Sequence, residues 1–142
     1  MEIMQTFERI LIIHILRWLE QKELLWLLKD MAIVVDGPLA LFGDPAGLLL
    51  PVTKEIRRIN EKAKKYTGGV DILLVGVEKS GFFVNHFEKI DQSKDGNSGK
   101  FPPQTVLLLN DEYIKKNIVF SDSKKRYGEQ TYFGRKFFYK TA

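Results

Sequence analysis

The sequence predicts an α/β fold built around a parallel strand–helix–strand unit. Two short apolar runs, residues 32–35 and 72–77, predict buried strands, and the amphipathic segment 52–66 predicts the helix between them. A crossover of this kind is right-handed and makes its two strands parallel. Since 142 residues are one domain's worth of chain, we expect a single domain over residues 1–142.

The first segment, residues 3–28, contains neither proline nor glycine and predicts one long helix. Its apolar residues cover more surface than the single stripe of an amphipathic helix. We therefore expect residues 1–30 to pack on the sheet with one side, and on a missing part of the domain or a second subunit with the other. His14 and Arg17 interrupt the segment, which is too short to span a membrane and lacks the layout of a signal peptide. We expect a cytoplasmic protein.

The later part of the chain alternates apolar and polar segments. We expect a short helix at residues 82–90, an exposed loop at 91–103 and a third buried strand at 106–109. A helix capped by Asn110-Asp111 is expected at 112–118, and a final aromatic and basic strand at 131–141.

Composition and charge exclude several classes of protein. The chain has no cysteine, so disulfides, thiol nucleophiles and thiolate metal sites are excluded, and its two histidines argue against a poly-histidine metal site. The net charge of +4 favours a polyanionic partner.

Between Lys124 and Lys140, six basic residues are interleaved with aromatic ones, which predicts nucleic-acid binding through residues such as Tyr132. The alternative is a solvated loop followed by a half-buried strand.

Two acidic residues, Asp36 and Glu78, come directly after the two buried strands of the predicted parallel unit. Parallel strands end at the same edge of a sheet, where α/β proteins bind their ligands. If the strands are neighbours, the two carboxylates would bind a hard divalent cation there, and Lys79 would contact a phosphate. The alternative is that these acids only shape turns.

Three other residues of reactive types are expected to have structural roles. Asp111 is expected to cap a helix. His86 is expected to be a packed or surface histidine, and His14 is expected to pack or to make a polar contact at an interface.

Three strings resemble segments of the NurA nuclease family, bacterial branch. They are AIVVDGPLALFG from residue 32, LVGVEKSG from residue 74 and YFGRKFFY from residue 132, and they occur in the family's order over about residues 5–141. This resemblance implies an RNase H-like mixed sheet with flanking helices. It also implies a Mn²⁺- or Mg²⁺-dependent nuclease that processes DNA ends in recombination repair, forms homodimers and works with a HerA-type hexameric ATPase.

The resemblance assigns roles to single residues. Asp36 would bind the metal, Glu78 would be a second carboxylate at or near it, and Glu20 is the nearest match to a glutamate of the preceding helix. DNA contacts would come from Lys79 and the final strand, at Tyr132, Arg135, Lys136 and Lys140.

The chain also departs from the family pattern. No Asp-Gly-Ser/Thr strand precedes Asp36 and no catalytic histidine follows Tyr139, so we expect a domain that lacks its first strands and its end. DNA cleavage by the chain alone is therefore left open. Two alternatives stay beside the nuclease: a non-catalytic DNA-binding or assembly module, and a small phosphate-ligand binder that uses the loop at Gly43–Gly47.

Overall fold

The computed structural model describes residues 2–41, 47–92, 99–118 and 135–141, and the chain divides into two compact units. Unit 1 comprises Met1–Val77 and Glu129–Phe133, and unit 2 comprises Glu78–Gly128 and Gly134–Ala142. Helices and strands alternate along the chain, which confirms the predicted α/β class. Parallel and antiparallel pairing both occur, in two separate two-stranded sheets.

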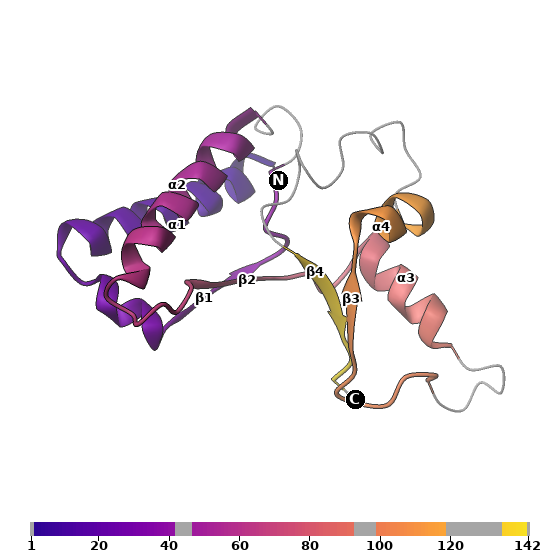
Figure 1. Ribbon diagram of the computed structural model, residues 1–142. Helices are drawn as coiled ribbons and strands as arrows, with labels where there is room; N and C mark the ends of the chain where they lie inside the picture. Colours follow the sequence, from indigo (N-terminus) through magenta and orange to yellow (C-terminus); the bar gives the residue numbers. More distant parts are fainter. Residues whose placement is uncertain (1, 42–46, 93–98, 119–134, 142) are drawn as a thin grey trace. The chain divides into compact units, whose positions relative to one another are not determined.

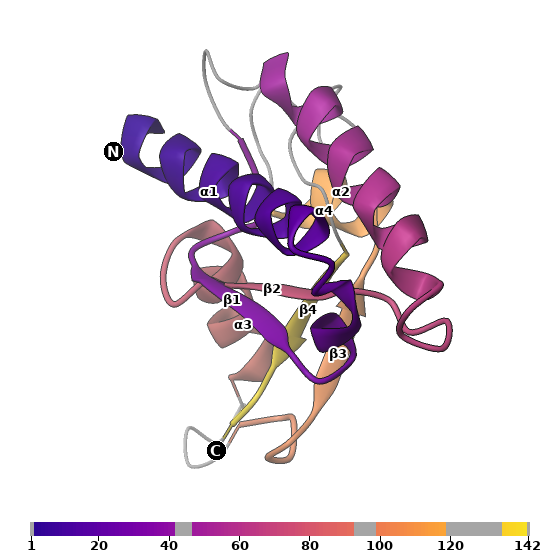
Figure 2. The same cartoon turned by 90° about the vertical axis from the view of Figure 1, so that its left-hand side faces the viewer.

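Unit 1 contains the predicted strand–helix–strand unit. Its elements are α1 (Glu2–Gln21), the 3₁₀ helix η1 (Leu25–Lys29), β1 (Ala32–Asp36), α2 (Leu49–Lys64) and β2 (Leu73–Val77). β1 and β2 pair in parallel over five residues, from Ala32 opposite Leu73 to Asp36 opposite Val77. Helices α1 and α2 lie side by side beside this pair (Figures 1 and 2).

The core of unit 1 lies between the two helices and one face of β1–β2. Alternate strand residues, among them Ile33, Val35 and Leu74, pack against buried side chains of the helices. Those side chains are Ile12, Leu16, Leu19, Leu25, Leu28, Ile59 and Ala63. The other face of the pair, which includes Val34 and Asp36, is exposed.

Helix α1 ends at Gln21, so the prediction of one continuous helix over residues 3–28 is wrong for its last seven residues. Glu23 adopts a φ of 60°. The amide of Leu24 donates to the carbonyl of Leu19, and the amide of Glu23 donates to the carbonyl of Glu20. This is the hydrogen-bond pattern of a Schellman motif, which ends a helix and is most often built with glycine. Here the turn brings Leu25 and Leu28 into the core.

Helix α1 has a second apolar face that is exposed. Its side chains follow one another at helical spacing: Ile3, Met4, Phe7, Ile10, Leu11, Ile15 and Trp18. Among the described residues, no helix combines the length and the apolar character that crossing a bilayer requires.

Unit 2 combines two helices with an antiparallel strand pair. Its elements are α3 (Phe82–Asp91), β3 (Val106–Leu109), α4 (Asp111–Asn117) and β4 (Lys136–Tyr139). Val106 pairs with Tyr139 and Leu109 with Lys136. Figure 1 shows α3 running alongside the two strands, and the ring of Phe87 on α3 stacks on that of Phe138 with centroids 4.8 Å apart.

Element boundaries in both units differ modestly from those expected. The Asn110 side chain accepts a hydrogen bond from the Tyr113 amide and caps α4, as predicted, whereas Asp111, which was also expected to cap, is the first residue of the helix. Helix α2 begins at Leu49 rather than at residue 52, because proline is tolerated in a first turn and Pro51 occupies that position. β4 covers four residues of the segment expected at 131–141, of which 131–134 lie outside the described residues.

Candidate functional site

Asp36 is the last residue of β1 and lies on the exposed face of the strand. The chain then turns at Gly37, whose φ of 86° suits glycine, and the Gly37 amide donates to the carbonyl of Val77 at the end of β2. Both strands therefore end together, as the sequence predicts for a parallel pair.

A buried arginine of α1 binds the backbone carbonyls of this turn. Arg9 of α1 is 1 % exposed, and it donates from Nε to the carbonyl of Pro38 at 3.1 Å and from Nη2 to the carbonyl of Asp36 at 3.0 Å. Its Nη1 also lies 3.3 Å from the Glu8 carboxylate. Because the guanidinium satisfies two carbonyls at once, it fixes the backbone from which the Asp36 side chain projects.

The turn passes very close to β2 at Gly76. A Cβ at that position would lie 2.6 Å from the Gly37 carbonyl oxygen and 2.8 Å from the Leu39 nitrogen. Only glycine leaves room for this approach, so the glycine in the second strand and the Asp-Gly-Pro turn after the first form one structural feature.

Glu78 is the first residue of unit 2 and forms an ion pair within that unit. Its Oε2 lies 2.7 Å from Nζ of Lys136 on β4, and the same ammonium lies 3.1 Å from the centroid of the Phe83 ring on α3. Burial lowers the pKa of Lys136 to about 8, although the hydrogen bond and charge of Glu78 act in the opposite direction. Glu78 therefore neutralises a largely buried lysine.

Lys140, just after β4, has a similar environment. Its Nζ lies 2.7 Å from Oδ2 of Asp91, and Oδ1 of Asp91 accepts from the amide of Phe101. The bond from Lys140 is the main cause that lowers the pKa of Asp91. Lys136, Phe138 and Lys140 alternate along the strand and share the face that packs against α3.

The opposite face of the strand pair is open. Phe137 and Tyr139 of β4 are 52 % and 51 % exposed, and Leu108 and Val106, which pair with them on β3, are 79 % and 52 % exposed. Arg135, one residue before β4, is also exposed. We call these four apolar side chains the open face of unit 2.

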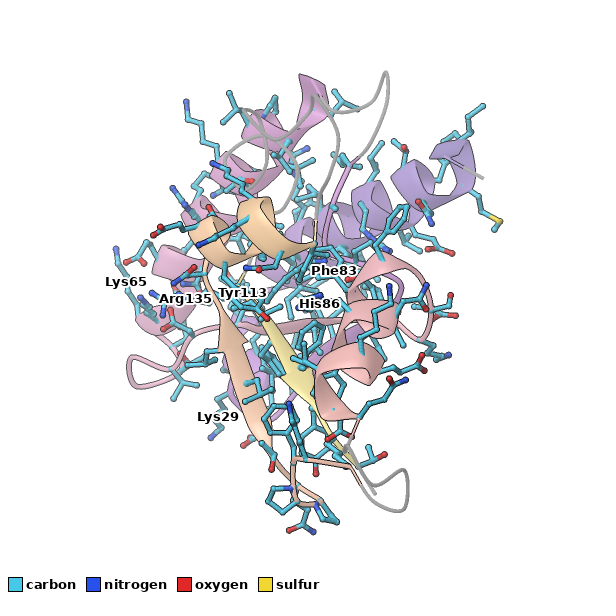
Figure 3. All side chains as sticks on the ribbon, turned by 90° about the vertical axis from the view of Figure 1, so that its right-hand side faces the viewer. Lys29, Lys65, Phe83, His86, Tyr113 and Arg135 are labelled. Atoms are coloured by element: carbon cyan, nitrogen blue, oxygen red, sulfur yellow. The ribbon has the colours of Figure 1, made fainter. Side chains whose placement is uncertain are left out.

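A histidine–tyrosine pair joins the two helices of unit 2. His86 of α3 lies with Nε2 2.8 Å from the hydroxyl of Tyr113 of α4, and Figure 3 shows the two side chains between these helices. Burial, followed by the charge of Lys89, lowers the pKa of His86 and favours the neutral imidazole. Its ring also contacts Phe138. The pair is a half-buried structural contact, as expected for a packed histidine.

Glu20 lies in an ionic network between α1 and α2. Its carboxylate accepts from Arg58 at 2.6 Å and from Lys62 at 2.8 Å, while Glu55 accepts from Arg58 and Arg17. Hydrogen bonds from these cations lower the pKa values of Glu20 and Glu55 to about 2. In this arrangement Glu20 binds two cations of the neighbouring helix.

The remaining predicted site residues are placed as follows. Lys79 and Arg135 are exposed, and Tyr132 lies outside the described residues, as does most of the loop at Gly43–Gly47. Over the part of the chain that the structure describes, no group of three or more His, Asp or Glu side chains could hold a metal ion.

Neither Arg9 nor the open face of unit 2 was predicted from the sequence as part of a site. The signal for Arg9 was present, because it precedes Ile12, Ile13 and Leu16 on the buried face of α1 by three, four and seven residues. The signal for the open face was the alternation of Phe137 and Tyr139.

Comparisons with protein-family models, with curated proteins and with solved structures find no significant match to this chain.

Proposed function

We propose that this chain belongs to a metal-dependent DNA nuclease of the NurA type with an RNase H-like fold. The observation that supports this most is the parallel pairing of β1 and β2, which end together at Asp36 and Val77. Glu78 is the next residue after Val77, so an acidic residue marks the end of each strand. The carboxylate site was predicted from this same arrangement, in which two parallel strands each end at an acidic residue.

In this proposal Asp36 is the principal metal ligand. Asp36 is an exposed residue on a backbone that Arg9 fixes, and a carboxylate oxygen suits Mn²⁺ or Mg²⁺. Glu78 has the right donor atoms, but its carboxylate is bound to Lys136 and would have to exchange that partner. When bound, the metal would activate water and stabilise charge on a phosphodiester.

The DNA contacts of the proposal differ in how readily each residue would make them. Lys79 and Arg135 are exposed and suit contacts with backbone phosphates. Lys136 and Lys140 would reach DNA only by leaving Glu78 and Asp91.

A cytoplasmic location, a homodimer and a HerA-type ATPase partner belong to the same proposal. The exposed apolar face of α1 would suit a protein partner.

The test compares DNA cleavage by the wild-type chain and two charge-matched variants. Linear and single-stranded DNA are incubated with Mn²⁺, with EDTA as the metal-free control. We expect cleavage that Asp36→Asn abolishes and that Asp30→Asn retains, because the Asp30 side chain is 75 % exposed and pairs only loosely with Lys29. Cleavage that Asp36→Asn leaves unchanged would remove Asp36 from the mechanism.

The second candidate is a DNA-binding or assembly module that does not hydrolyse DNA. It is favoured by the ion pair of Glu78 with Lys136, which occupies one of the two predicted carboxylates. This candidate predicts metal-independent DNA binding that weakens steeply with salt, and no cleavage under any of the conditions above.

A further inference from the structure

The two faces of β4 have different chemistry. Lys136, Phe138 and Lys140 face α3, where both lysines are paired with carboxylates and the phenylalanine is buried. The alternating residues Phe137 and Tyr139 project to the other side and are half exposed. Half-exposed aromatic rings on a strand are unusual in a unit that has a core of its own, so the open face calls for an explanation.

The geometry of the open face suits flat, stacked ligands. Phe137 and Tyr139 are two residues apart, so their attachment points lie roughly 6.7 Å apart along the strand. Leu108 and Val106 flank them in register on β3. Nucleic-acid-binding sheets such as that of the RRM display aromatic side chains in this way, and each ring stacks on one unpaired base.

The net charge of unit 2 indicates which kind of molecule would bind the open face. Among its described residues, unit 2 contains eight Lys or Arg and five Asp or Glu, a net charge of +3, whereas unit 1 contains ten and nine, a net charge of +1. Most of the positive excess of the described residues therefore lies in the unit with the open face. A second copy joined through this face would bring two such units together, whereas a polyanion would be attracted.

We propose that the open face of unit 2 binds single-stranded DNA, with Phe137 and Tyr139 each stacking on a base and Arg135 contacting the backbone. The choice of DNA over RNA rests on the proposed function, but the binding needs neither Asp36 nor a metal. Double-stranded DNA would bind more weakly here, since its bases are stacked within the duplex and cannot reach the rings.

The test is binding of a fluorescent oligothymidylate of roughly 12 nucleotides to the full chain in EDTA, measured by anisotropy. We expect Phe137→Ala and Tyr139→Ala each to weaken binding by about 5-fold or more, and Tyr139→Phe to bind like the wild type. Phe82→Ala is the matched control, since this phenylalanine is 80 % exposed at the start of α3. Phe137→Leu keeps an apolar side chain for folding and still loses the aromatic ring.

A second pair of variants tests the charged contact. Arg135→Gln should weaken binding and lower the salt dependence by about one ion, whereas Lys116→Gln, an exposed change of the same charge on α4, should do neither.

Three other results would overturn the proposal. Equal binding by folded Phe137→Leu, Tyr139→Ala and wild type would exclude stacking, and tighter binding of duplex or of the matching RNA would exclude single-stranded DNA as the ligand. Self-association that Phe137→Leu abolishes, without DNA binding, would identify a second copy as the occupant. Binding without cleavage in Mn²⁺ would reject the proposed nuclease alone, since the binding assay contains no metal.

Discussion

Lys136 Nζ lies 2.7 Å from the Glu78 carboxylate and 3.1 Å from the centroid of the Phe83 ring. The lysine side chain is 12 % exposed and that of Glu78 is 26 % exposed, so both charges have lost most of their water. The ion pair and the ring replace that hydration. This contact joins the residue that follows β2 to the first residue of β4 across 58 positions of the chain.

Glu78→Gln is expected to lower the free energy of unfolding by about 2 kcal/mol, because it leaves a largely buried ammonium without its counter-charge. Lys136→Met should be less damaging, since the exposed part of Glu78 can then be hydrated and the methionine keeps the contact with Phe83. Urea denaturation of these variants and of Lys116→Met, an exposed control, measures both effects. An unfolding free energy of Glu78→Gln equal to that of the control would mean that the pair does not stabilise the fold.

Stability is expected to fall as the pH drops from about 4.5 towards 2. Glu20 and Glu55 have pKa values of about 2 in the folded chain against an ordinary value of 4.5, so the unfolded chain binds protons first in this range. Their contribution is present above pH 4.5 and is lost as the pH falls through 2. Thermal melts across this range should show a shallower slope for the Glu20→Gln/Glu55→Gln double variant. Glu88→Gln, an exposed change on α3, should keep the wild-type slope.

Gly76→Ala is expected to destabilise the chain by about 2 kcal/mol or more, because the new Cβ would meet the backbone at Gly37 and Leu39, which cannot move as a side chain could. Gly47→Ala is the matched control. A Cβ there has nothing within 4 Å, so its unfolding free energy should stay within about 0.5 kcal/mol of the wild type. Similar melting temperatures for the two variants would contradict the close approach of the turn to β2.

Arg9→Met is expected to lower the unfolding free energy by about 3 kcal/mol, because the carbonyls of Asp36 and Pro38 lose a charged donor. Arg57→Met, an exposed change on α2, should have little effect. Arg9→Lys should recover only part of the loss, since an ammonium lacks the planar fork that reaches both carbonyls. Full recovery by lysine would indicate that the charge alone matters.

The sequence predicted the parts of the fold that depend on local patterns. The apolar runs that became β1 and β2, and the capping residue Asn110, are visible within a few residues of chain. The end of α1 was missed because Glu23 adopts a left-handed conformation that a non-glycine residue accepts at a cost of about 1 kcal/mol. Packing of Leu25 and Leu28 in the core offsets that cost, and no local signal reports it.

The candidate site was predicted less completely, since its contacts join distant positions. The position of Asp36 at a strand end follows from the sequence, but its support by Arg9 spans 27 residues. Lys136 and Lys140 were expected to face DNA because they are basic. Their pairing with Glu78 and Asp91 depends on which face of β4 is turned towards α3, and neither sign nor spacing of charges fixes that choice.

The alternation of basic and aromatic side chains along β4 also fixes the register of its pairing with β3. A slip of one residue would turn Phe137 and Tyr139 towards α3 and expel both lysines into water, leaving Glu78 and Asp91 without their cations. These two carboxylates therefore disfavour a β3–β4 pair that is shifted by one residue. An insertion or deletion of a single residue in this strand would exchange its two faces at once.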